Sequence, residues 1–205
     1  MAGITELATG APGYSSVLPN SMSPLAKTLK LNGYNTAQFG KCHEVPVWQS
    51  SPVGPFDQWP TGGGGFEYFY GFIGGDANQW QPNLFRNTTQ IYPFEGKPGW
   101  NLVTGMADDA INYMTRIHQI DPSKPIFIKY APGATHAPHH PTREWVDKVS
   151  AMHLFDDGYE KVRERIFENQ KRLGVIPQDA RLPPWPTEVL KPWDQLSADE
   201  KKLFI

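Results

Sequence analysis

Cysteine is nearly absent from this 205-residue sequence, in which Cys42 is the only one. A single thiol excludes an internal disulfide and any metal site built from several cysteines. A strong charge of one sign is also lacking, because the formal net charge is -2, so nucleic acid and anionic membrane surfaces are unfavourable partners. No apolar run approaches the roughly 20 residues of a membrane-spanning helix, and the run at 126–128 already ends at Lys129.

Proline, glycine and aromatic residues, in contrast, are abundant. The chain has 20 Pro and 19 Gly, a share that excludes a helical bundle or a coiled coil. Aromatic residues make up 13% of the sequence, whereas disordered segments contain few of them. The composition therefore predicts a packed, loop-rich domain, and the length is sufficient for one such domain.

Helical and strand patterns alternate in the first two thirds of the chain and predict an α/β core segment. A helix is expected to begin at Ser23 as its N-cap and to stop before Gly33, with a strand following at 34–39. A second helix is predicted over 103–118, where apolar residues recur three or four positions apart. The β-branched and aromatic run at 126–131 then predicts a buried strand.

The segments around these elements carry weaker signals. Residues 1–22 form an irregular lead-in, and residues 46–100 form a long glycine- and aromatic-rich excursion in which the four glycines at 62–65 are interpreted as a flexible loop. The continuation over 151–205 is helical and proline-rich, with a charged helix predicted near 157–173. The apolar positions of that helix that are expected to face inward are Tyr159, Val162, Ile166 and Leu173.

The end of the chain carries a helix start without a full helix. Ser197 and Glu200 form a capping box, and only the eight residues 198–205 follow the cap. That length is below the roughly 12–15 residues that an isolated helix needs. The pattern predicts that the sequence is the central part of a larger domain.

Potential cations follow two of the predicted strands. Lys41 and His43 come after the first strand, and because they are two residues apart an extended chain would place both on one face. His136 comes after the second strand. Ligands of α/β sheets bind beyond the carboxyl ends of strands, so these groups suit a sulfate or phosphate anion. The alternative is a solvated loop lysine beside a packed histidine.

Two other polar clusters are assigned no ligand. A zinc site in the histidine-rich segment is disfavoured, because no thiolate is near and the intervening prolines forbid a helix that would align the rings. The histidines concerned are His136, His139 and His140. The acidic pairs at 108–109 and 156–157 are interpreted as solvated helix faces or helix N-caps.

Taken together, the motifs resemble those of one enzyme family. Residues 33–43, Gly-Tyr-Asn-Thr-Ala-Gln-Phe-Gly-Lys-Cys-His, resemble the Gly-Tyr-x-Thr-Ala-x-x-Gly-Lys-Trp-His signature of the sulfatase family, the arylsulfatase branch of the alkaline-phosphatase-like superfamily. The aromatic segment 66–72, the strand and His-x-Pro loop at 127–138 and Arg-Glu-Trp at 143–145 follow in the family's order. The resemblance implies an α/β fold, part of an alkaline-phosphatase-like mixed sheet sandwiched by helices and incomplete at both ends.

The same resemblance implies a chemistry and roles for three residues. Sulfatases hydrolyse sulfate esters through a formylglycine made from Cys or Ser, with a bound divalent cation, usually calcium. By position, Lys41 would hold the sulfate, His43 would contact the formylglycine hydroxyl, and His136 would bind the sulfate and assist departure of the leaving group. Preplaced donors of this kind stabilise a developing anion. The implied substrate is a sulfated small molecule or sugar.

The sequence nevertheless lacks the nucleophile that the family requires. The formylglycine motif, Cys/Ser-x-Pro-x-Arg, occurs nowhere in it, and nothing marks the thiol of Cys42 as activated. In the family, that motif and a first acidic metal pair precede the matching segment, and a second metal pair and a lysine follow it. Residues 1–205 are therefore predicted to be a partial sulfatase catalytic domain that is inactive alone. The alternatives are a non-catalytic module that binds sulfate, another anion or a partner, and an incompletely recorded gene.

Overall fold

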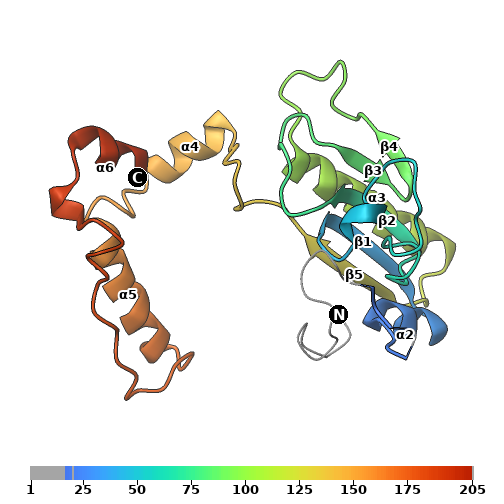
Figure 1. The fold of residues 1–205 in the computed structure, drawn as a ribbon, viewed down its shortest axis with the longest axis horizontal. Helices are drawn as coiled ribbons and strands as arrows, with labels where there is room; N and C mark the ends of the chain where they lie inside the picture. The colour runs from blue at the N-terminus through green and yellow to red at the C-terminus, as the bar shows by residue number, and fades with distance from the viewer. Residues whose placement is uncertain (1–16, 20, 205) are drawn as a thin grey trace. The chain divides into compact units, whose positions relative to one another are not determined.

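The computed structural model describes residues 17–19 and 21–204. The chain divides between His140 and Pro141 into two compact units (Figure 1). Most of the irregular lead-in predicted at 1–22 lies outside the described residues. Within the described ranges, no helix is both long enough and apolar enough to cross a membrane.

The first unit begins with a helix, a tight turn and a strand, as the sequence predicts. Helix α2 spans Leu25–Leu31 and strand β1 spans Asn35–Cys42, three residues longer than expected at its carboxyl end. The N-cap of α2 is Pro24, one residue after the predicted cap. The hydroxyl of Ser23 does not cap the helix, because it accepts a hydrogen bond from the Thr28 hydroxyl at 3.1 Å.

The five described strands form one mixed sheet in the order β4-β3-β2-β1-β5. The other four strands are β2 (Tyr68–Ile73), β3 (Leu84–Arg86), β4 (Thr89–Ile91) and β5 (Ile126–Ala131). Strand β1 pairs in parallel with β2 on one side and with β5 on the other. Strands β2, β3 and β4 continue as an antiparallel meander. The predicted α/β class with a mixed sheet is confirmed.

Helix α3 (Leu102–Ile120) covers one face of the sheet and confirms the helix predicted over 103–118. The Asn101 side chain caps it by accepting the backbone N–H of Val103 at 3.0 Å. Each large apolar side chain buried beneath it contributes about 1.5–3 kcal/mol of hydrophobic stabilisation. This core comprises Ala37, Phe39, Tyr70, Phe72, Leu84, Leu102, Met106 and Ala110.

The opposite face is covered by the loop between β1 and β2, which contains the short 3-10 helix η2 (Val47–Gln49). Trp59 is fully buried there, edge-on to Phe56 and to Phe85 with ring centroids 4.9 Å apart in each pair. Its indole N–H donates to the Gln49 carbonyl at 2.6 Å. The glycine- and aromatic-rich excursion is thus folded, as the aromatic content predicts.

The four glycines interpreted as a flexible loop lie in a loop with its own hydrogen bonds. They form consecutive turns in which the N–H of Gly64 donates to the Trp59 carbonyl at 3.1 Å. A Cβ on Gly65 would lie 2.6 Å from the backbone nitrogen of Lys27. Glycine is therefore required at position 65 for close packing against the backbone of α2.

Strand β5 lies where the sequence predicts it, but it is less buried than expected. Its residues are half-buried, and Tyr130 is exposed. The reason is its position, because β5 is an outer strand of the described sheet and pairs only with β1 there. The apolar pattern of a parallel strand does not reveal whether the strand is central or at an edge.

The second unit is helical. It contains α4 (Arg143–Ser150), α5 (Tyr159–Arg172), the 3-10 helix η3 (Trp193–Gln195) and α6 (Ala198–Phe204). The predicted capping box is present, since Glu200 accepts the backbone N–H of Ser197 at 2.7 Å and donates its own N–H to the Ser197 hydroxyl at 3.2 Å. The inward face predicted for the charged helix is only partly present. Tyr159 and Val162 are half-buried, and the Tyr159 ring stacks on Trp185, whereas Ile166 and Leu173 are largely exposed.

Candidate functional site

The carboxyl ends of β1, β2 and β5 lie at one edge of the sheet. The register pairs Gly40 of β1 with Ala131 of β5, and Cys42 of β1 with Ile73 of β2. Lys41 and His43 leave this edge from β1, and the loop that carries His136 leaves it from β5. The topology therefore directs the three predicted site residues to one edge of one sheet, where parallel α/β proteins bind ligands.

Lys41 is held by the backbone of a tightly paired strand. Its carbonyl accepts a hydrogen bond from the buried Gln38 amide at 3.0 Å. The preceding residue must be glycine, because Gly40 has a φ of 93° and a Cβ there would lie 2.1 Å from the Ala131 carbonyl oxygen. Lys41 itself is half-buried, so its stem is fixed by the sheet and a long flexible side chain remains to carry the ammonium.

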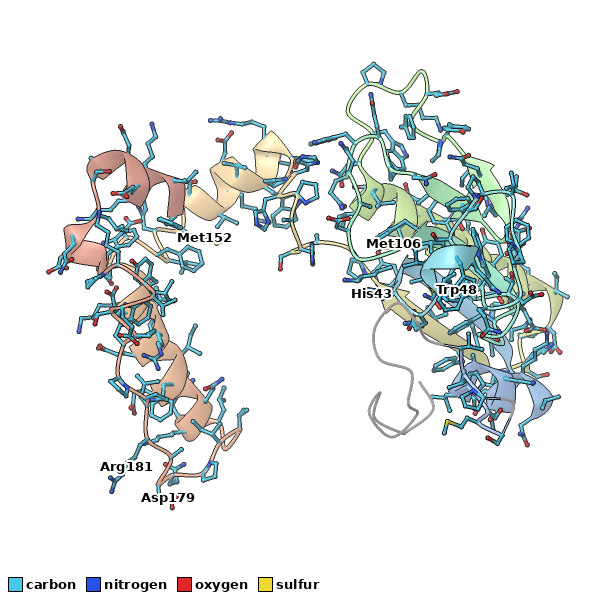
Figure 2. The ribbon with its side chains drawn as sticks, viewed as in Figure 1. His43, Trp48, Met106, Met152, Asp179 and Arg181 are labelled. Atoms are coloured by element: carbon cyan, nitrogen blue, oxygen red, sulfur yellow. The ribbon has the colours of Figure 1, made fainter. Side chains whose placement is uncertain are left out.

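His43 lies immediately beyond the strand, and its side chain is exposed (Figure 2). Strand β1 ends at Cys42, whose carbonyl accepts the Gly74 N–H at 2.8 Å. The sequence prediction that Lys41 and His43 share one face required the strand to continue through His43. The strand ends one residue before it. The loop conformation, and not strand periodicity, sets the direction of the imidazole.

The residues on either side of His43 in the sequence, Cys42 and Glu44, interact with each other and with Lys129. Glu44 forms an ion pair with Lys129 of β5. Burial raises the pKa of the Cys42 thiol to about 12, and the nearby Glu44 carboxylate adds to that rise. Burial also opposes ionisation of Glu44, but the ammonium of Lys129, together with hydrogen bonds from Cys42 and the backbone, lowers the pKa of this carboxyl. Cys42 is thus a protonated core thiol with no nucleophilic character at neutral pH.

His136 lies in the exposed loop after β5. Its Nδ1 is 2.7 Å from the carbonyl oxygen of Ala137, and its backbone N–H donates to the Gly133 carbonyl at 2.9 Å. A carbonyl oxygen only accepts, so Nδ1 carries the proton in this contact and Nε2 is the second nitrogen of the ring. Nε2 accepts a proton when the ring is neutral and donates one when it is charged, as a group beside a leaving oxygen must.

His140, in contrast, has a structural role. Its Nδ1 accepts the backbone N–H of Gln79 at 3.4 Å, and its carbonyl accepts from the Asn101 amide at 3.5 Å. These contacts join the His136 loop to the N-terminus of α3. Across the described ranges, no three His, Cys, Asp or Glu residues are grouped as a metal site would require.

Gln79 packs beside the His136 loop and was not singled out from the sequence. It is buried, its carbonyl accepts the Leu102 N–H at 2.7 Å, and its Oε1 has no hydrogen-bond partner among the described residues. A Cβ added to Gly133 would lie 3.4 Å from its Nε2, so the amide packs against the His136 loop. The sequence predicted only that Gln79 lies in the folded excursion over 46–100, and nothing in that pattern distinguished this glutamine from its neighbours.

One acidic pair also differs from its interpretation. Asp109 was expected to be solvated or to cap a helix, but it binds the Arg86 guanidinium and the Tyr68 hydroxyl, each at 2.5 Å. Asp156 contacts the His153 ring at 2.7 Å, and Asp157 lies 3.8 Å from the Arg165 guanidinium. The spacing of the acidic pairs did not predict these partners, because none of the partners belongs to the pair itself and those of Asp109 lie on two strands.

The groups that sulfatases use for catalysis do not fit the residues described here. Calcium binds through a cage of six to eight oxygen ligands, and no grouping of acidic side chains offers one in the described part of the chain. A formylglycine requires the Cys/Ser-x-Pro-x-Arg motif, which the sequence does not contain. The sole thiol, Cys42, is buried in the core.

The architecture defines a mixed α/β protein with candidate anion-binding residues beyond its parallel strand ends. The family model for sulfatases matches residues 2–168, well over half of the sequence, and the chain belongs to the sulfatase family. The resemblance carried by residues 33–43 is thereby confirmed.

Two curated relatives match nearly the whole chain. It is 24% identical over 201 residues to an arylsulfatase of Klebsiella aerogenes, covering 94% of this chain and 40% of that protein. It is 26% identical over 199 residues to an uncharacterised sulfatase of Schizosaccharomyces pombe, covering 94% of this chain and 35% of that protein. The chain thus spans two fifths or less of these relatives.

Solved structures share the fold at low sequence identity. One, described with glycosaminoglycan metabolism by Bacteroides thetaiotaomicron, has a TM-score of 0.56 at 17% identity and covers 85% of this chain and 45% of its own. A second, solved with its substrate D-glucosamine-2-N,6-O-disulfate, has a TM-score of 0.51 at 18% identity and covers 74% and 26%. A third, solved with k-i-k-neocarrahexaose, has a TM-score of 0.51 at 21% identity and covers 65% and 31%. The neighbours confirm the alkaline-phosphatase-like fold.

Proposed function

We propose that this chain supplies the sulfate-binding side of a sulfatase site, in which Lys41, His43 and His136 bind the anionic group of a sulfate ester. The observation that carries the proposal is the parallel pairing of β1 with β5, which brings the two histidine-bearing loops to one edge of the sheet. Membership of the sulfatase family supports sulfate-ester hydrolysis as the parent activity.

The chemistry of the three residues suits this role. The Lys41 ammonium offers three hydrogen-bond donors to sulfate oxygens. With Nδ1 of His136 bonded to the Ala137 carbonyl, Nε2 is the nitrogen that would donate to the bridging oxygen as the leaving alcohol departs. His43 adds a second imidazole at the end of β1. These donors stabilise negative charge without forming a covalent bond to the substrate.

We expect the 205-residue chain to bind sulfate esters without hydrolysing them. Hydrolysis by a covalent route needs a nucleophile, and the only thiol is buried and protonated. The partial sulfatase domain predicted over 1–205 and the non-catalytic anion-binding module therefore make the same prediction for this polypeptide. They differ in what happens when the missing catalytic residues are supplied by further chain.

Two solution measurements test the proposal. Turnover of 4-nitrophenyl sulfate should be undetectable with and without added calcium, and turnover that disappears in Lys41→Ala would refute the inactivity. Calorimetry with inorganic sulfate should show saturable binding that weakens at least tenfold in Lys41→Ala and in His136→Ala. Lys30→Ala and His118→Ala are matched controls at exposed positions of α2 and α3, and they should bind sulfate as the unmodified chain does. Equal binding by all variants would overturn the site.

The nature of the sulfated compound is a further part of the proposal. Two of the solved neighbours are titled as complexes with sugars, one of them a glucosamine disulfate. A sulfated sugar is accordingly the substrate class that we expect for the parent activity. A sulfated small molecule of another kind is the alternative, and the two are separated by the binding experiment below.

A further inference from the structure

A pocket of about 350 Å³ lies outside the three predicted site residues, in the first unit. Its volume is at the lower end of the roughly 300–1,000 Å³ that small-molecule sites occupy. Two indoles and a phenyl ring form part of its lining, with an amide and an ammonium beside them. These residues are Trp80, Phe94, Trp100, Gln81 and Lys97.

The pocket lies at the same edge of the sheet as the candidate sulfate site. Strand β3 is antiparallel to both β2 and β4, so β2 and β4 run in the same direction and end at the same edge. The segment that carries Trp80 leaves β2 there, and the segment that carries Lys97 and Trp100 leaves β4 there. Gln79, next to Trp80, contacts both His140 and Leu102 and so links the pocket to the His136 loop.

The aromatic walls are fixed in place by their surroundings. Gly105 of α3 allows the Trp100 indole to pack on the first turns of the helix, because a Cβ there would lie 2.7 Å from its Cζ2 atom. The backbone N–H of Trp100 donates to the Lys97 carbonyl at 3.1 Å, and the centroid of the Phe94 ring lies 5.9 Å from that of the Trp100 ring. The backbone N–H of Trp80 donates to the Asn78 side-chain oxygen at 2.8 Å, which fixes the chain from which this indole extends. Such preorganisation lowers the entropy cost of ligand binding.

We propose that this pocket binds a sugar ring of the sulfated compound, with Trp80 and Trp100 as stacking surfaces and Gln81 and Lys97 as hydrogen-bond donors. The inference rests on the proposed function, because it makes the pocket a subsite of the same sulfate-ester site. The face of an indole is negatively polarised and attracts the positively polarised C–H groups of a sugar. The hydroxyls at the ring edge need polar partners, which an amide and an ammonium provide and which an aryl group would not use.

The test compares four probes by calorimetry with the 205-residue chain. They are inorganic sulfate, lactose, lactose carrying one sulfate ester at the galactose 6-position, and 4-nitrophenyl sulfate. Sulfated lactose should bind at least tenfold more tightly than inorganic sulfate. Trp80→Ala should abolish that advantage and leave the affinity for inorganic sulfate unchanged. The matched control is Trp48→Ala, an exposed indole outside the pocket lining (Figure 2), which should change neither affinity.

A second variant, Lys97→Ala, keeps the pocket testable if Trp80→Ala fails to fold, because Lys97 lies at an exposed loop position. It should weaken binding of sulfated lactose at least threefold, with an unchanged circular dichroism spectrum. If the unmodified chain binds sulfated lactose no better than inorganic sulfate, or if 4-nitrophenyl sulfate alone gains affinity through Trp80, the sugar subsite is refuted. Trp80-dependent binding of unsulfated lactose without any sulfate binding would support the sugar pocket and refute the proposed function, so the two failures are distinguishable.

Discussion

The guanidinium of Arg86 and the carboxylate of Asp109 lie 2.5 Å apart and join β3 to α3. The hydroxyl of Tyr68 on β2 donates to the other oxygen of the same carboxylate, also at 2.5 Å. Burial and then Asp109 raise the pKa of Tyr68, so its phenol remains a donor throughout the neutral range. One carboxylate thereby connects two strands of the sheet to the helix that covers them.

Replacing this carboxylate should destabilise the first unit. We expect Asp109→Ala to lower the free energy of unfolding by about 2 kcal/mol, because hydrogen bonds to a charged group contribute roughly 1.5–3 kcal/mol. Urea titration followed by tryptophan fluorescence measures the change. Asp108→Ala is the matched control, since this neighbouring residue is exposed, and it should change stability by no more than about 0.5 kcal/mol. Equal effects of the two substitutions would show that the Arg86 contact contributes nothing.

The close approach of β1 and β2 gives a second prediction. A Cβ on Gly71 would lie 1.9 Å from the Gly40 carbonyl oxygen, a distance that only a shift of the strands relieves. Gly71→Ala should therefore cost about 3 kcal/mol or more in the free energy of unfolding. Gly74→Ala, just beyond the same strand, meets no atom within 4 Å and should cost only about 1–2 kcal/mol for its positive φ. A smaller effect at Gly71 than at Gly74 would contradict the strand pairing.

The buried thiol gives a prediction for chemical modification. Because burial raises the pKa of Cys42 to about 12, the native chain should react with iodoacetamide at pH 8.5 at least about 100-fold more slowly than the chain unfolded in urea. An unfolded thiol ionises above about pH 8.5, whereas the folded one stays protonated until far higher pH. Stability is consequently lost as pH rises through this window. Mass spectrometry of the alkylated chain measures both rates, and comparable rates would contradict the buried position.

Much of the fold was predictable because its signals are local. The 3.6-residue periodicity of α3 and the β-branched run of β5 depend only on neighbouring residues, and both elements lie where the sequence places them. The capping box of α6 is a pattern of four residues and was predicted for the same reason. The family signature at 33–43 in turn identified the strand that carries Lys41.

The features that were missed depend on contacts between distant residues. Asp109 finds its partner 23 positions away, on β3, so a pattern within one helix could not reveal it. The packing of Gly65 was missed because composition does not show that the α2 backbone lies against this glycine. The contacts of Gln79 and the place of Trp80 in the pocket lining were not predicted for the same reason, because they involve segments that meet only in the folded chain. Local rules place elements, whereas tertiary packing decides which side chains share a site.

The ion pair between Glu44 and Lys129 gives a prediction for acid stability beside the candidate site. Burial works against ionised Glu44, yet Lys129 lowers its pKa below the ordinary value. A carboxyl with a lowered folded-state pKa stabilises the fold above its unfolded pKa of about 4.3, and this contribution disappears as pH falls through the folded value. In Lys129→Met the hydrogen bonds from Cys42 and the backbone still favour the carboxylate, but burial is less strongly opposed, so the pKa of Glu44 rises and its stabilising contribution shrinks.

The difference in unfolding free energy between the unmodified chain and Lys129→Met should therefore be largest near pH 7, should begin to shrink below about pH 4.3, and should be lost as pH falls through the lowered folded-state pKa of Glu44. Urea titrations at several pH values measure it, and the NMR titration of the Glu44 carboxyl carbon should move to higher pH in the variant. Lys97→Met is the control, because this loop lysine is exposed and forms no ion pair with the described residues. A stability difference independent of pH would mean that Lys129 acts through packing of its stem rather than through its charge.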